Sequence, residues 1–176
     1  MTTIVAVIEE GVGTWIGADS LVTSGHQRAG QCDKWVRGKG FAIGVSGHLF
    51  TIDLLRHSVR SFRANMDAHE VWDTVQRLSF KAGHMASNKE GDPSWRDIGM
   101  VWATKKHVWS YSGSGGACVF KAGILASVGS GSNYAEGAWV ALEGVGLEYK
   151  PRLLRCLKAA LSWDTASGGP IFLERL

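Results

Sequence analysis

Residues 2–20 read TTIVAVIEEGVGTWIGADS, and this stretch decides the fold. Residues 2–10 alternate in polarity and are rich in β-branched side chains, which indicates a β-strand. The glycines of GVG then turn the chain into TWIGADS at 14–20, so the two segments form a hairpin. Strands joined by such a tight turn are antiparallel neighbours, because parallel strands need a long crossover connection.

The remainder of the chain alternates blocks of strands with pairs of helices. KWVRG and FAIGVSG within 34–47 predict a second hairpin, and apolar residues at every third or fourth position of 49–66 predict one helix. Asp67 and Glu70 resemble the capping box of a second helix, whose apolar stripe covers 71–85. The second half has strands at 97–104, 107–112 and 118–123, helices at about 133–143 and 151–163, and a last strand at 170–176.

This order of elements predicts an α+β protein, with helices outside both of two antiparallel sheets. A chain of 176 residues fits a single domain spanning 1–176. Its 45% hydrophobic and 20% charged residues are those of an ordinary soluble globular protein. A disordered chain and a coiled coil are therefore both disfavoured.

Charge and cysteine content argue against several classes of protein. The formal net charge is +3 with scattered Lys and Arg, so nucleic acid is not an expected partner. No apolar run approaches the ~20 residues that cross a bilayer, and the first thirty residues lack the basic start of a signal peptide. Three cysteines far apart fit a reducing cytoplasm, and six histidines without ligand spacing predict no metal site.

Thr2 is a candidate nucleophile that would carry its own base. Methionine is usually removed before a residue as small as threonine, and its removal would leave Thr2 with a free α-amine. Such an amine has a pKa of about 7.7–8.0, close to the value that suits a general base at neutral pH. Because the amine and the hydroxyl belong to one residue, little orientational freedom remains to be lost.

A lysine beside that hydroxyl would favour the alkoxide and hold the amine neutral. Lys34 is the candidate, and Asp19, at the end of a predicted strand, is the carboxylate that would hold the lysine in place. From the residues alone, the preferred interpretation is a strand-end ion pair between the two, worth about 0–1 kcal/mol if exposed. Ser130 could likewise be no more than the cap of the helix that follows it.

Six segments, in order along the chain, together resemble the proteasome-type N-terminal-nucleophile (Ntn) hydrolases, the family of proteasome β subunits and bacterial HslV. They are TTIVAV at the start, GADS around Asp19, GQCDKWV around Lys34, FAIGVSG, ASVGSGSNYAEGA and DTASGGPI. Their combination is most similar to the small bacterial proteasome homologues, the BPH group. The resemblance implies a four-layer αββα sandwich, two antiparallel sheets flanked by helix pairs, which agrees with the order of elements above.

The resemblance also implies a role for each matching residue. Thr2 would be the nucleophile and base, Lys34 its activator and Asp19 the partner of Lys34. The N–H of Gly44 would form the oxyanion hole, where one donor is typically worth about 10²–10³ in rate. The α-amine and its water would be held by Ser130, Asp164 and Ser167. The residues expected to line the substrate pocket are Val22, Cys32, Val36 and Ala42.

These roles predict a threonine endopeptidase that needs no cofactor. Family members enclose their sites in stacked rings, so we expect a homo-oligomeric double ring of six or seven subunits per layer that acts on unfolded polypeptides. An ATPase unfoldase would be a further partner, and the sequence does not identify which one. Two alternatives stay open: a catalytically silent ring scaffold of the same fold, and an acylase of the same superfamily that cleaves small amides.

Overall fold

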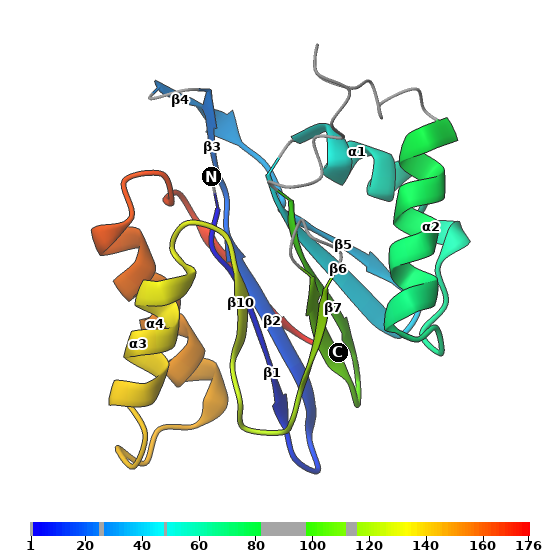
Figure 1. The fold of residues 1–176 in the computed structure, drawn as a ribbon. Coiled ribbons are helices and arrows are strands. Elements are labelled where there is room, and N and C mark those ends of the chain that lie inside the picture. The colour runs from blue at the N-terminus through cyan, green and yellow to red at the C-terminus, as the bar shows by residue number, and fades with distance from the viewer. Residues whose placement is uncertain (1, 25–26, 48, 82–97, 112–115) are drawn as a thin grey trace.

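Two antiparallel sheets form the middle of the molecule (Figure 1). The structure is a computed structural model that describes residues 2–24, 27–47, 49–81, 98–111 and 116–176. One sheet has the strand order β10 (Ala126–Val128), β1 (Ile4–Glu9), β2 (Gly13–Asp19) and β11 (Ile171–Arg175). The other has the order β5 (Trp35–Gly38), β6 (Phe41–Ser46), β7 (Gly99–Thr104), β8 (Val108–Tyr111) and β9 (Ala117–Phe120).

A pair of helices covers the outer face of each sheet (Figure 1). The helices α1 (Leu49–His57) and α2 (Ala68–Lys81) pack on the five-stranded sheet, and α3 (Ser132–Ala141) and α4 (Tyr149–Trp163) pack on the four-stranded one. The layers are therefore helix, sheet, sheet, helix, and the predicted αββα sandwich is confirmed. Among the described residues, no helix combines the length and the apolarity needed to span a bilayer.

Among the residues that the structure describes, three hydrophobic clusters hold the four layers together. Between the sheets, Ile4 and Ile16 pack among small side chains and are fully buried. Beneath α1 and α2, the rings of Phe41 and Trp102 stack with their centroids 4.6 Å apart. Beneath α3 and α4, the side chain of Leu157 is fully buried. Burying one such large side chain stabilises the fold by about 1.5–3 kcal/mol, so each cluster fixes the spacing of its two layers.

The single helix predicted over 49–66 is wrong in its length. α1 ends at His57, and the chain then makes a 3₁₀ turn, η1 (Val59–Ser61), and a second turn over residues 63–66 before α2 begins. Phe62 and Met66 nevertheless enter the cluster beneath α1 and α2. Their helix-like spacing arose because both side chains reach the same core from non-helical backbone, and spacing alone cannot separate these two cases.

The predicted capping box at the start of α2 is confirmed. The N–H of Asp67 donates to Glu70 Oε2 and the N–H of Glu70 donates to Asp67 Oδ1, each over 2.9 Å. The part of the predicted stripe beyond Lys81 lies outside the described residues. One hairpin was not predicted: β3 (Leu21–Ser24) and β4 (Gln27–Gln31) form a separate two-stranded sheet between Asp19 and Lys34.

The ends of several elements meet at one end of the four-stranded sheet. Ile4 is the register partner of Ala18 on β2 and of Val128 on β10. Ile171, the first residue of β11, is the partner of Asp19. The residues just before β1, just after β10 and just before β11 therefore come together around Asp19.

Candidate active site

Asp19 and Lys34 form a buried ion pair. The Lys34 ammonium donates to both carboxylate oxygens of Asp19 over 2.9 Å, and the two side chains are 3% and 0% exposed. Asp19 also accepts the backbone N–H of Thr3 at 2.8 Å and that of Gly168 at 2.9 Å. A buried pair is stable only when its remaining hydrogen-bonding capacity is filled, and these amides fill that of Asp19. The small energy of an exposed pair therefore does not apply here.

Burial lowers the pKa of the Lys34 ammonium below the ordinary lysine value. The negative charge of Asp19 and its hydrogen bonds oppose this effect without cancelling it. A lysine whose proton is less tightly held than usual, and whose position is fixed by a carboxylate, is suited to assist proton transfer at a neighbouring hydroxyl.

A second group of polar side chains gathers around Asp164, directly after α4. Asp164 Oδ2 accepts hydrogen bonds from Ser130 Oγ and Ser167 Oγ, both over 2.6 Å, and Oδ1 accepts the N–H of Ala166 at 3.1 Å. Burial acts to raise the pKa of the Asp164 carboxyl, but these hydrogen bonds outweigh it and hold the pKa below the ordinary value. Asp164 is thus kept as an anion that is positioned by two hydroxyls.

Thr3 joins the two polar groups, and sequence reasoning did not single it out. Its N–H donates to Asp19, and its Oγ1 lies 2.7 Å from Ser167 Oγ in the group around Asp164. The side chain is completely buried. The doubled threonine at the start of the chain was the available signal, but only the first threonine has an obvious chemical use there.

Glycines in the loop after β10 allow this close packing. A Cβ added at Gly131 would lie 2.0 Å from Thr3 Oγ1, and one added at Gly129 would lie 1.8 Å from the carbonyl oxygen of Thr2. Gly129 also has a φ of +101°, a backbone conformation that other residues rarely adopt. The VGSGS segment is therefore glycine-rich because its backbone presses against residues 2 and 3.

Thr2 and Lys34 line one small cavity, together with Val22 of β3 and Gly47 after β6. Its volume is about 30 Å³, and Thr2 is 4% exposed. This is room for about one water molecule. The arrangement places a threonine, a lysine of lowered pKa and space for one water at a single point.

The structure brings most of the expected catalytic residues together but separates those expected to line the substrate pocket. Val22 lies at the cavity of Thr2. Cys32 and Val36 pack instead in the cluster beneath α1 and α2. Ala42 is fully buried between the two sheets. Of the four, only Val22 lines the cavity of Thr2.

Gly44 is not at this cavity, because its amide belongs to the sheet. The N–H of Val45 donates to Lys34 O, toward the β5 edge. Successive N–H groups of a strand point to opposite edges, so that of Gly44 points to β7, where Gly44 is the register partner of Val101. Gly47 does line the cavity.

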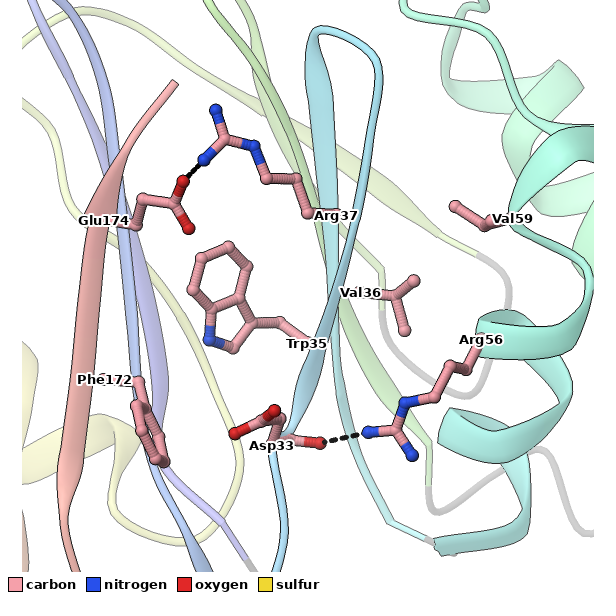
Figure 2. Close-up of a pocket in the computed structure, with 8 residues that line it drawn as sticks. All are labelled: Asp33, Trp35, Val36, Arg37, Arg56, Val59, Phe172 and Glu174. Carbon is pink, nitrogen blue, oxygen red and sulfur yellow. Dashed lines mark hydrogen bonds and ion pairs between the residues drawn. The ribbon is translucent and has the colours of Figure 1, made fainter.

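A larger cavity of about 440 Å³ lies apart from Thr2, where β5 and β11 form the open edges of their sheets. Figure 2 shows Trp35 beside the ion pair between Arg37 and Glu174, and Phe172 farther along, toward Asp33. Neither Thr2 nor Lys34 lines this cavity. Within the described ranges, no three His, Cys, Asp or Glu side chains gather into a metal-binding group.

No family model matches the sequence, and no curated protein matches it. Solved structures do match. BPH from Thiobacillus denitrificans matches with a TM-score of 0.75 and 19% identity, over 99% of this chain and 98% of that chain. HslV from Trypanosoma brucei gives 0.69 and 20% over 98% of both chains. The Gly-1 mutant of Anbu from Hyphomicrobium sp. strain MC1 gives 0.73 and 15%, over 100% of this chain and 81% of that one.

These matches agree with the layers described above. The fold is that of the proteasome-like Ntn hydrolases, represented by BPH, HslV and Anbu, and it extends over the whole chain. The resemblance drawn from the sequence segments is thereby confirmed at the level of the fold.

Proposed function

We propose that this protein is a threonine peptidase in which Thr2, once Met1 has been removed, is the nucleophile. One observation carries the proposal: Thr2 and Lys34 line the same small, partly open cavity, and the lysine is held by a fully buried Asp19. A buried lysine–carboxylate pair with no neighbouring reactive group would be hard to explain by stability alone, because desolvation offsets most of its attraction.

The proposed reaction begins with transfer of the Thr2 hydroxyl proton to the α-amine of the same residue. The oxygen attacks the peptide carbonyl, and the C–N bond breaks as the amine returns the proton to the leaving nitrogen. A water then attacks the acyl-enzyme, with the α-amine again as base, and releases the product acid. Lys34 lowers the energy of the alkoxide, and the anionic group around Asp164 holds the α-amine and its water.

For the oxyanion hole we favour the N–H of Gly47 over that of Gly44. Gly47 lines the cavity of Thr2, whereas the amide of Gly44 is directed into the sheet. A donor aimed at the developing oxyanion is typically worth about 10²–10³ in rate. We keep Val22 in the substrate pocket because it lines the cavity of Thr2, whereas Cys32, Val36 and Ala42 do not line that cavity.

We further propose that the chain assembles into stacked rings of six or seven copies that admit unfolded polypeptides in the cytoplasm, with an ATPase as a partner still to be identified. This part rests on the fold, which the chain shares with BPH and HslV, and on the ring assembly that the family resemblance implies. Native mass spectrometry tests this part, and a stable monomer would contradict it.

The experiment that tests the chemistry combines N-terminal mass determination with activity on fluorogenic peptides. Chain that begins at Thr2 should cleave peptides, and a Thr2→Ala variant should not. A BPH structure from Thiobacillus denitrificans contains epoxomicin, so epoxomicin is a suitable probe here too. Absence of both cleavage and labelling in chain that begins at Thr2 would favour the silent scaffold. Cleavage of acylated small amines but not of peptides would favour the acylase.

A further inference from the structure

The hydroxyl of Thr3 occupies a junction that the proposed chemistry leaves without a role. It is completely buried, 2.7 Å from Ser167 Oγ, while the N–H of the same residue is bonded to Asp19. Thr3 thereby touches both polar groups of the site and is covalently joined to Thr2. It does not line the cavity of Thr2, so it is not placed to touch a substrate.

The direction of each hydrogen bond around Thr3 follows from counting protons. The carboxylate of Asp164 can only accept hydrogen bonds. Ser167 must therefore donate its single hydroxyl proton in the 2.6 Å bond to Asp164 Oδ2. The oxygen of Ser167 is then the acceptor toward Thr3, and Thr3 Oγ1 is the donor. The result is a directed chain from Thr3 through Ser167 to Asp164, and chains of this kind strengthen each of their bonds.

We propose that Thr3 is a positioning residue for the threonine nucleophile, acting through Ser167 and Asp19. Its hydroxyl fixes the rotation of the Thr3 side chain, and its N–H fixes the peptide plane that follows Thr2. With both anchored, the hydroxyl and the α-amine of Thr2 are held between Lys34 and Asp164. This inference rests on the proposed function, because positioning has a measurable consequence only if Thr2 reacts.

Thr3→Val tests this, because valine keeps the shape of threonine and removes the donor. A methyl carbon also cannot approach Ser167 Oγ as closely as 2.7 Å, so the side chain must move. Misplacing a reacting group by about 1 Å costs up to about 10²-fold, so kcat should fall by about 10–10²-fold while KM changes by less than about threefold. Thr3→Ser, which keeps the hydroxyl, should recover most of kcat.

The matched control is Thr14→Val in β2. Thr14 is also completely buried, and among the described residues its hydroxyl has no hydrogen-bond partner. This variant should leave both kcat and KM unchanged. If Thr3→Val does not fold, Thr3→Ala removes the same donor without adding a bulky methyl, and the comparison with Thr3→Ser is made against that variant.

Failure of this inference is distinguishable from failure of the proposed function. If unmodified chain that begins at Thr2 neither cleaves peptides nor takes up epoxomicin, the proposed function fails, and the positioning role fails with it because there is no reacting Thr2 to position. If that chain is active and Thr3→Val retains full kcat, the positioning role is refuted. Equal losses in the Thr3 valine and serine variants would also refute it, because they would reflect packing and not the hydroxyl.

Discussion

Replacing Gly131 by alanine is the sharpest steric probe of the candidate site. Gly131 precedes α3 with a φ of −88°, which alanine adopts without backbone strain. The added Cβ would lie 2.0 Å from Thr3 Oγ1, 3.1 Å from Ala160 Cβ and 3.2 Å from Asp164 Oδ2. The substitution therefore acts on the two polar groups through a single methyl group and changes no charge.

The expected magnitude follows from these distances. Ordinary van der Waals contact begins at 3.4 Å, so Thr3 Oγ1 or the loop must shift by more than an ångström. Overpacking of a well-packed interior costs about 1–3 kcal/mol of unfolding free energy. A displacement of that size next to the nucleophile lowers the rate by about 10²-fold. We expect both effects in Gly131→Ala.

The assay is urea unfolding together with peptide cleavage, with Gly137→Ala as the control. Gly137 lies in the exposed middle of the same helix, and a Cβ there would meet nothing within 4 Å. The control should gain about 0.5–1 kcal/mol, because alanine is the better helix residue, and should keep full activity. If Gly131→Ala behaves like Gly137→Ala, the close packing of the loop on Thr3 is refuted.

Three further outcomes are expected. Lys34→Met leaves Asp19 buried with only its amide donors, so urea unfolding should show a loss of about 3 kcal/mol, toward the low end for a broken buried pair; an unchanged midpoint would contradict the burial. The pKa of Asp164 is lowered in the folded protein, so its contribution to stability is present above pH about 4 and is lost as the pH falls through the folded-state pKa. Asp164→Asn should therefore lose less stability between pH 7 and pH 3 than the unmodified chain, and parallel losses would count against this. Thr14→Val should raise the midpoint by removing an unpartnered buried hydroxyl, a gain of about 1 kcal/mol; a lower midpoint would show that the hydroxyl has a partner.

The layers of the fold were predictable because each depends on short-range pattern. Alternation in 2–10, the tight turns of the hairpins and the capping box of Asp67 and Glu70 are all local signals, and each element they predicted is present. The exception, the helix predicted through Met66, shows the limit of such signals. The spacing of apolar residues indicates which side chains face a core. It does not indicate which backbone conformation places them there.

The candidate site was predictable only in part, for a different physical reason. Polar residues at element ends indicated Asp19, Lys34 and Asp164, and the resemblance connected them. The register of β6, which directs the amide of Gly44 into the sheet, depends on pairing with β5 and β7 and cannot be read from the FAIGVSG segment. Thr3 escaped notice because its importance comes from two partners far along the chain.

The bond from Gly168 to Asp19 has a consequence for the time at which the site forms. Asp19 lies near the beginning of the chain, yet one of the four hydrogen bonds that its carboxylate accepts comes from residue 168, and Asp164 and Ser167 belong to the same late segment. While only the first half of the chain has left the ribosome, neither group of polar residues can form completely. The chemistry proposed here would thus begin only after residues 164–168 have left the ribosome, which would protect other nascent chains from premature cleavage.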